Sequence, residues 1–164
     1  MLKGRFTRNR GFSLLELVIV VVIIGIIAAI AIPRMSRGTA GAADSALTGD
    51  LAVLRNAIDL FAAEHDGKFP TAADIAKQLT MYTDFTNTNA PVAAKDKDHP
   101  FGPYIRAVPK LPVGASKGKD AITGTGPAGA DATAGWFYDE VTGKIVANCG
   151  PGEADSQEKK YSDY

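Results

Sequence analysis

Apolar residues form one long run near the start of the chain. Every position from Leu17 to Ile32 is apolar or glycine, and the run extends back to Phe12 with Glu16 as its one charged residue. As a helix these roughly 21 residues would be about 31 Å long, close to the thickness of one hydrocarbon core. The pattern predicts a membrane-spanning helix, with a weak point at Pro33 because proline has no N–H to donate.

A second pattern follows, in which single apolar residues recur three or four positions apart. The spacing predicts an amphipathic helix, and it lasts too briefly to indicate a coiled coil. Asp50, Arg55 and Asp59 fall outside the apolar stripe, and Gly67 is suited to a left-handed cap at the helix end. The stripe consists of Leu47, Leu51, Leu54, Ile58 and Phe61.

The remainder of the chain is rich in loops. Residues 71–79 predict a short helix with Thr71 as N-cap. Residues 136–138 and 144–147 predict the two strands of a hairpin, whose turn is Asp139–Gly143. Residues 114–135, rich in Gly, Ala and Thr, predict an exposed loop, and the polar residues 150–164 predict a disordered tail.

Together these elements predict an α+β fold. A long N-terminal helix, half in the membrane and half amphipathic, would pack on a small antiparallel sheet, since a soluble helix with one apolar stripe must cover it. The segments expected are a leader (1–11), a transmembrane helix segment (12–37), the amphipathic half of the helix (38–66), a loop-rich head (67–149) and a polar tail (150–164).

Charge is unevenly distributed along a chain whose formal net charge is zero. The first eleven residues contain Lys3, Arg5, Arg8 and Arg10 and no acid, which would keep that end in the cytoplasm and place the head outside it. From Gly38 onward 12 Lys and Arg stand against 17 Asp and Glu, a net charge of about −5 (12 − 17). An acidic head has no electrostatic footprint for nucleic acid.

An ordinary secretory signal is the simplest alternative, because Ala29-Ile30-Ala31 has the A-x-A pattern of a cleavage site. The apolar run is longer than the apolar core of a usual signal sequence, however, and the basic region stops at the single glycine Gly11. In addition, Glu16 places a carboxylate in apolar surroundings, which costs several kcal/mol unless the group has a partner. Neither a signal peptide nor an inert anchor needs that residue.

A cut between Gly11 and Phe12 would supply the partner. It would create an α-amine on Phe12 one helical turn before Glu16. The amine could pair with the carboxylate within one chain or between neighbouring helices. Such a pair would set the axial register of packed helices, because leaving either charge alone in lipid is unfavourable.

The string Arg10-Gly11-Phe12-Ser13-Leu14-Leu15-Glu16, followed by the apolar run, resembles the class III leader of type IV pilins and type II secretion pseudopilins. The resemblance implies a pilin-like fold. It also implies that a prepilin peptidase and methyltransferase cuts after Gly11 and methylates Phe12, and that Glu16 guides assembly. Residues 50–71 resemble the corresponding region of pseudopilins, where a helix end runs into a glycine turn and Phe-Pro.

The leading functional hypothesis is therefore a structural subunit of a filament, a type II secretion pseudopilin. The alternatives are a type IV pilin of an extracellular fibre for adhesion, motility or DNA uptake, and a membrane-tethered binding module. The expected partners are copies of the chain, other pilin-like subunits, the peptidase and the inner-membrane assembly machinery. We expect a single-pass protein of the bacterial inner membrane, cytoplasmic at its N-terminus before processing, with a filament in the periplasm or at the cell surface.

Residues with catalytic or metal-binding chemistry are few. No nucleophile motif surrounds Cys149, the one cysteine, and His65 and His99 are interpreted as a helix-end residue and a loop residue. We therefore expect no enzyme activity. Calcium ligands in the head could come from carboxylates, but none lies in an Asp-x-Asp run, so no cofactor is expected. The carboxylates considered are Asp131, Asp139, Glu140, Glu153 and Asp155.

Overall fold

The computed structural model describes residues 12–87, 89–125, 129 and 131–164, without the side chains of residues 32–38. Contacts divide the chain into two units, Met1–Thr39 and Ala40–Tyr164, which are described separately. One helix, α1 (Leu14–Glu64), contributes to both units and is continuous through Pro33. The α+β class predicted from the sequence is confirmed, because the second unit adds a short helix and a three-stranded sheet.

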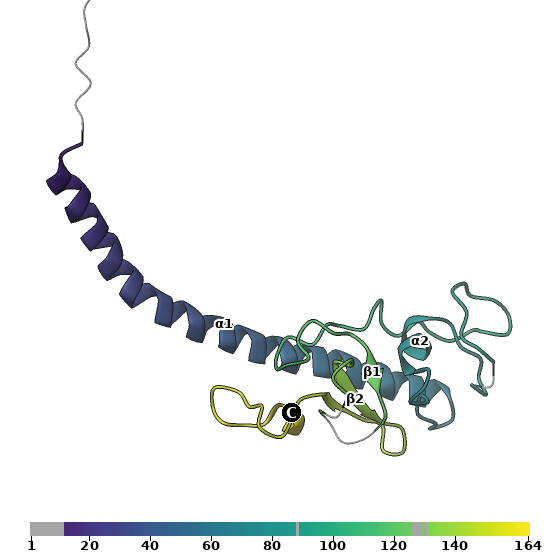
Figure 1. Cartoon of the computed structure of the whole chain (residues 1–164). Helices are drawn as coiled ribbons and strands as arrows, with labels where there is room; N and C mark the ends of the chain where they lie inside the picture. Colours follow the sequence, from purple (N-terminus) through teal and green to yellow (C-terminus); the bar gives the residue numbers. More distant parts are fainter. Residues whose placement is uncertain (1–11, 88, 126–128, 130) are drawn as a thin grey trace, which may run out of the picture. The chain divides into compact units, whose positions relative to one another are not determined.

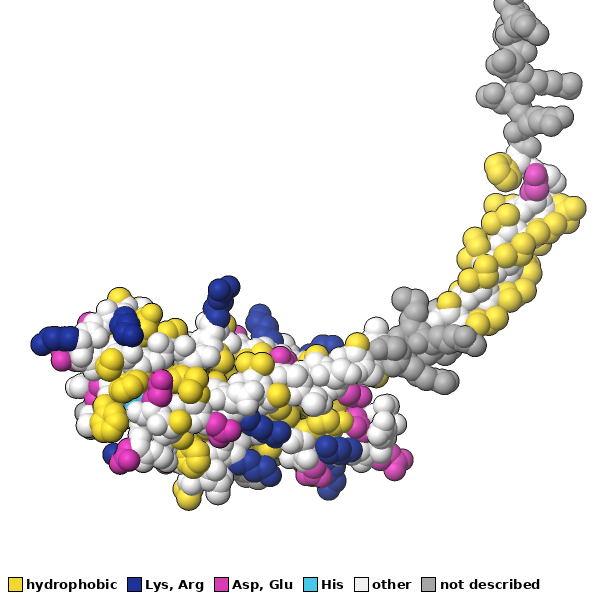
Figure 2. Space-filling view, turned by 180° about the vertical axis from the view of Figure 1, so that it is seen from behind, with side chains coloured by type: hydrophobic (Ala, Val, Ile, Leu, Met, Phe, Trp, Pro, Cys, Tyr) yellow, Lys and Arg dark blue, Asp and Glu magenta, His cyan; other side chains and the backbone are white. Residues whose placement is uncertain are grey.

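In the first unit, the N-terminal part of α1 exposes apolar side chains (Figure 2). Residues 14–30 include large apolar side chains that are between 46% and 81% exposed, and none of the segment Leu14–Ala31 is buried. Among the described residues, this 18-residue segment is the one helix long and apolar enough to cross a membrane. An apolar surface of this extent is unfavourable in water, which is consistent with the membrane segment predicted.

In the second unit, the stripe predicted on α1 forms one side of the core. Its five residues, from Leu47 to Phe61, are all between 0% and 1% exposed. They pack against Trp136, Tyr138 and Ile145 of the sheet, and Figure 1 shows β1 and β2 beside this part of α1. The amphipathic helix and its burial against the sheet are therefore confirmed.

The end of α1 also follows the prediction. The helix ends at Glu64, and Gly67 adopts a φ of 76° while its N–H donates to the carbonyl oxygen of Ala62 over 2.8 Å. This bond satisfies a carbonyl of the last helical turn. Asp66 also has a left-handed φ of 56°, so it shares with Gly67 the cap that the sequence assigns to the glycine alone.

The sheet has the order β1-β2-β3. The hairpin is confirmed: β2 (Trp136–Asp139) pairs antiparallel with β3 (Lys144–Ala147), with Trp136 opposite Ala147. The sheet is mixed and not purely antiparallel, because β1 (Ile122–Thr123) pairs parallel with β2. This strand lies within residues 114–135, which were predicted as a loop; two residues are too few to produce a visible alternation of apolar and polar positions.

The short helix α2 spans Ile75–Thr80 and begins four residues later than predicted. Asp74 is its N-cap residue, so the expectation that Thr71 is the cap is wrong. Instead, the Thr71 N–H donates to Oε1 of Gln78 over 2.8 Å. The side chain of Gln78 is buried and satisfies this backbone donor, a contact across seven residues that capping patterns do not include.

The predicted disorder of residues 150–164 is also wrong. This C-terminal segment contains a bridge between Ala154 and Lys160, followed by a 3-10 turn, η1 (Tyr161–Asp163), that contacts β3. The Tyr161 hydroxyl donates to Asp44 on α1 over 3.1 Å, and Arg55 Nη2 donates to the main-chain oxygen of Tyr164 over 2.5 Å. Polar composition predicted disorder, whereas tyrosine rings and specific hydrogen bonds hold the segment on the helix.

Candidate functional site

The predicted processing and assembly residues lie at the start of α1. Gly11 is outside the described residues. Phe12 precedes the helix and is 84% exposed, and Glu16 lies in the first turn. Phe12 and Ser13 are not helical, so the helix begins two residues after the predicted cut.

Glu16 is held by a residue that the sequence analysis did not single out. Its Oε2 accepts a hydrogen bond from the Ser13 N–H over 3.2 Å, while Ser13 Oγ accepts one from the Leu15 N–H over 3.3 Å. The Ser13 carbonyl accepts the first helical bond, from the Leu17 N–H over 3.1 Å. Ser13 and Glu16 thus form one half of a capping box, the bond from the Ser13 N–H to Glu16, while the Ser13 hydroxyl accepts from Leu15 and not from Glu16. The S-x-x-E pattern before an apolar run is the sequence signal for this cap.

The electrostatics of this helix end favour an acid. The free N–H groups and the helix dipole produce a partial positive charge there, which a carboxylate in the first turn offsets. Beyond Glu16, the exposed side chains of the segment up to Ala31 are apolar or glycine. The apolar helix therefore has one carboxylate, that of Glu16, at its N-terminal end. The bond to the Ser13 N–H orients this carboxylate back toward Phe12.

A comparison with protein families matches this same part of the chain. The family described as "Prokaryotic N-terminal methylation motif" matches residues 6–32. The chain carries this methylation motif. The match confirms the resemblance to the type IV pilin-like family over the leader and the membrane helix, and it does not extend into the head. No curated protein and no solved structure was found to match the chain.

The motif match and the apolar helix agree with one another. Residues 6–32 include the predicted cut site, Glu16 and the whole of the exposed apolar segment Leu14–Ala31. A prepilin-type motif indicates a structural subunit that is processed at its leader and assembled into pilin-like filaments, and the apolar helix fits a single-pass inner-membrane anchor. The motif occurs in both pilins and pseudopilins, so it does not distinguish them.

The candidate thiol is buried in the head. Cys149 is 1% exposed, and burial, with a smaller contribution from the carboxylate of Glu153, raises the pKa of its thiol to about 12. A nucleophilic or metal-binding cysteine needs the thiolate form, which this environment disfavours.

The two histidines have separate surroundings. His65 is fully buried and stacks on Phe61 with ring centroids 3.8 Å apart. Its Nδ1–H donates to the Phe61 carbonyl over 2.7 Å, and Nε2 forms a hydrogen bond with the Thr83 hydroxyl over 3.1 Å. His99 bonds to Asp96 over 2.8 Å in a loop, and this bond lowers the pKa of the Asp96 carboxyl. His65 therefore belongs to the core and not to an exposed helix end.

The carboxylates considered for calcium accept hydrogen bonds from their own chain. Glu153, for example, accepts from the N–H groups of Ala115 over 2.5 Å and Gly150 over 2.6 Å, and so connects two loops. Within the part of the chain that the structure describes, no three His, Cys, Asp or Glu residues come together as a metal site would require. The carboxylates considered for calcium are those of Asp131, Asp139, Glu140, Glu153 and Asp155.

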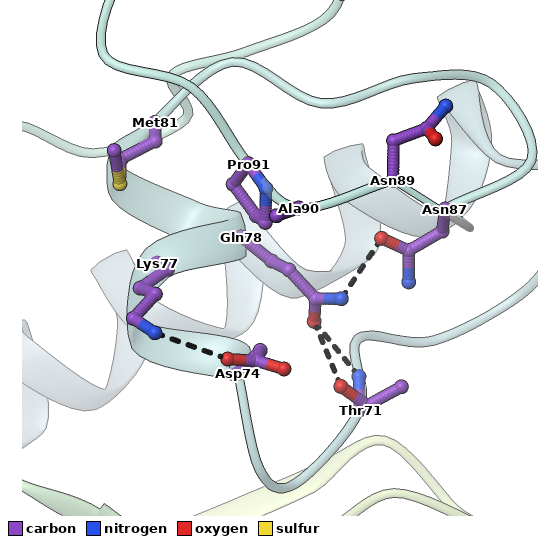
Figure 3. A pocket seen from close by; sticks show the side chains of 9 residues that line it. All are labelled: Thr71, Asp74, Lys77, Gln78, Met81, Asn87, Asn89, Ala90 and Pro91. Carbon is purple, nitrogen blue, oxygen red and sulfur yellow. Dashed lines mark hydrogen bonds and ion pairs between the residues drawn. The ribbon is translucent and has the colours of Figure 1, made fainter.

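A pocket of about 500 Å³ lies in the head between α2 and the loop after it (Figure 3). The Gln78 amide occupies one side: Oε1 accepts from the Thr71 N–H, and Nε2 donates to Asn87 Oδ1 over 2.8 Å. Lys77 pairs with Asp74 at 3.4 Å. Because the bond from Gln78 to Asn87 joins α2 to the loop that follows it, the evident role of the Gln78 amide is to hold that loop against the helix.

Proposed function

We propose that the chain is a structural subunit of a pilin-like filament, specifically a type II secretion pseudopilin, cut after Gly11 and N-methylated on Phe12. The observation that carries the proposal is the methylation motif at residues 6–32, which coincides with an exposed apolar helix whose first turn contains Glu16. The helix anchors the subunit in the inner membrane until it enters the filament, and the head remains outside the cytoplasm.

A second feature supports assembly. In the second unit, the face of α1 opposite the core exposes small and apolar residues, with Val53 50% and Leu60 51% exposed. Asp59 is the one charged residue among the exposed positions, whereas the outer face of a solvated helix normally carries many charges. The exposed positions are Ala40, Gly41, Ala42, Ser45, Ala46, Thr48, Gly49, Ala52, Val53, Asn56, Asp59, Leu60 and Ala63.

The polar groups on this face are partly used within the helix. The Ser45 hydroxyl donates to the Gly41 carbonyl over 2.9 Å, and the Thr48 hydroxyl donates to the Asp44 carbonyl over 3.2 Å. Little hydrogen-bonding capacity is therefore lost if a neighbouring subunit covers the face. We assign this outer face of α1 to contacts between subunits, which repeat by a rotation that does not close and so give a helical filament.

The pseudopilin assignment, in preference to a type IV pilin, depends on sequence features. Residues 50–71 resemble pseudopilins, and the single cysteine excludes the C-terminal cysteine pair common in pilins. Location and cargo separate the two functions. If the chain is a pseudopilin, cells that lack it stop exporting secreted proteins to the medium. If it is a pilin, cells that lack it have no fibres in the fraction sheared from the cell surface.

The experiment is therefore a deletion strain complemented with the native gene. We expect exported proteins to disappear from the medium and return on complementation, with the chain itself in the membrane fraction. Intact export, together with recovery of the chain in sheared fibres, would refute the pseudopilin assignment and favour the type IV pilin.

A further inference from the structure

Phe85 lies in the loop after α2, and 56% of its side chain is exposed. Among the described residues of the second unit, it is the one aromatic side chain that is more than half exposed. Its ring centroid lies 6.2 Å from that of Phe101, which lies 5.4 Å from that of His65 in the core. A row of aromatic rings therefore leads from the core to an exposed phenylalanine.

The loop that contains Phe85 is held by hydrogen bonds on both sides of this residue. Asp84 is 6% exposed, and its Oδ2 accepts from the Thr86 hydroxyl over 2.6 Å. The Gln78 amide of α2 donates to Asn87 Oδ1 over 2.8 Å. These bonds fix the backbone that presents the ring to solvent. An exposed aromatic side chain on a fixed backbone is typical of an interface, where such residues act as anchors.

An apolar groove of about 230 Å³ lies on the outer face of the hairpin. Trp136 and Tyr138 belong to the core, so Phe137 between them faces the opposite side of the sheet. A cavity of about 150 Å³ is enough to hold benzene, so the groove has room for one phenyl ring. The residues that line it are Phe137, Asp139, Lys144, Val146 and Ser162.

The groove and Phe85 lie at different levels along α1. The carbonyl of Ile145, next to Val146, accepts from Arg55 of α1 over 3.2 Å, which places the groove at the level of Arg55. Phe85 lies at the level of His65, ten residues further along the chain (65 − 55), or about 15 Å of helix. Figure 1 shows the C-terminal segment (yellow), which borders the groove, and the loop after α2 (teal) toward opposite ends of this part of α1.

This displacement determines the kind of contact that the two surfaces can make. A second copy that is shifted along the direction of α1 brings its groove to the ring of the first. Such a contact joins two different surfaces, so it repeats from copy to copy without closing and extends a filament.

The charges at the groove favour an aromatic occupant. Lys144 is exposed at its edge, and an ammonium group over the face of an aromatic ring is attracted to it. The other charged residue, Asp139, accepts from the Thr142 hydroxyl over 2.7 Å and from the Val141 N–H over 3.0 Å, within the turn of the hairpin. The groove thus combines apolar side chains with a cation, which a phenyl ring satisfies better than an aliphatic side chain does.

We propose that Phe85 of one subunit inserts into the groove of Phe137, Val146 and Lys144 on the next copy of the chain. The inference rests on the proposed function, because it joins successive subunits of a filament. It adds a contact between heads that is separate from the outer face of α1.

Photo-cross-linking in membranes tests the contact directly. In the full-length chain, p-benzoylphenylalanine replaces Phe85 and so keeps an aromatic side chain at this position. We expect irradiation to give a product with the mass of two chains, in which position 85 of one copy is joined to residues 137–146 or to Ser162 of the other. In the same background, Lys144→Arg should keep the product, whereas Lys144→Glu should lower its yield severalfold.

Substitution of Phe85 measures the strength of the contact. Phe85→Ala should lower the association of subunits about five- to tenfold, because the exposed half of the ring is no longer buried on assembly. Phe85→Tyr keeps the ring and should assemble like the native chain. The yield of chemically cross-linked oligomers measures both variants, and thermal unfolding confirms that each head is folded.

The contact is refuted if position 85 gives no two-chain product, or if the product joins it to residues of the other copy outside the groove. Native oligomer yields from a folded Phe85→Ala would refute it as well. A product with a different protein would refute a second copy as the occupant. Failure of the proposed function is seen separately, as a chain whose N-terminus is not Phe12 but which still gives the two-chain product.

Discussion

The outer face of α1 in the second unit gives the sharpest prediction about assembly. We consider the double substitution of Val53 and Leu60 by lysine. Both side chains are about half exposed in the single chain, and neither belongs to the core that holds the sheet on α1. If a neighbouring subunit covers this face, both substitutions place a charge in the contact while leaving the fold of the head unchanged.

The magnitude follows from the exposed fractions. Complete burial of a valine or leucine side chain contributes about 1.5–3 kcal/mol. Because 50% and 51% of these side chains remain exposed, covering the rest contributes about half of that for each, or about 1.5–3 kcal/mol for the pair. This corresponds to an association constant about 10- to 100-fold lower in the variant, before the desolvation of two ammonium groups lowers it further.

The assay is cross-linking of subunits in membranes, followed by quantification of oligomers. Val141→Lys is the matched control, because Val141 is 82% exposed in the hairpin turn and lies outside the proposed contact. Thermal unfolding of each purified variant checks that the head is intact. Equal oligomer yields from the double variant and from Val141→Lys, with both heads folded, would show that this face of α1 does not contact another subunit.

Three further predictions concern the head. Leu54→Ala, at a position that is 0% exposed in the core, should lower the free energy of unfolding by about 2–5 kcal/mol in urea titrations, and a change below 1 kcal/mol would contradict the packing described. Tyr161→Phe removes the hydroxyl bond to Asp44; it should lower the free energy of unfolding by about 1 kcal/mol and speed proteolysis of residues 150–164. Ser162→Ala is the control, because its hydroxyl bonds to the neighbouring Asp163, and it should leave cleavage at the native rate. Burial raises the pKa of Cys149 to about 12 and also raises the pKa of Tyr138. Because both pKa values are higher in the folded than in the unfolded chain, the stability that burial of the neutral groups contributes should be fully present below about pH 9 and should fall as the pH rises toward 12. A free energy of unfolding that does not change over this range would refute the burial of these groups.

Elements that depend on repeated apolar spacing could be predicted from the sequence. The stripe from Leu47 to Phe61 shows the periodicity that burial imposes on a helix, and the hairpin is marked by aromatic and β-branched residues on both sides of a turn that contains Gly143. Both were therefore predicted at nearly their observed positions. The membrane segment was found for the same reason. Its apolar run is long enough to cross a membrane.

Elements held by single polar contacts could not be predicted. The C-terminal segment depends on Tyr161 and Arg55, whose partners lie 117 and 109 residues away in sequence, so its polar composition indicated disorder. The start of α2 depends on Gln78, which bonds to the Thr71 N–H. At the candidate site, Glu16 was found because a carboxylate in an apolar run is costly, while Ser13 was missed although the capping pattern was present.

The central claim is that the chain is processed as a pilin-like subunit, and mass spectrometry of its N-terminal peptide tests this most directly. The protein is recovered from membranes of cells that express the full chain. We expect a peptide that begins at Phe12 and is heavier by one methyl group, in agreement with the methylation motif at residues 6–32. A peptide that begins at Ile32, after the Ala29-Ile30-Ala31 sequence, would identify a conventionally secreted domain and contradict the account of the filament.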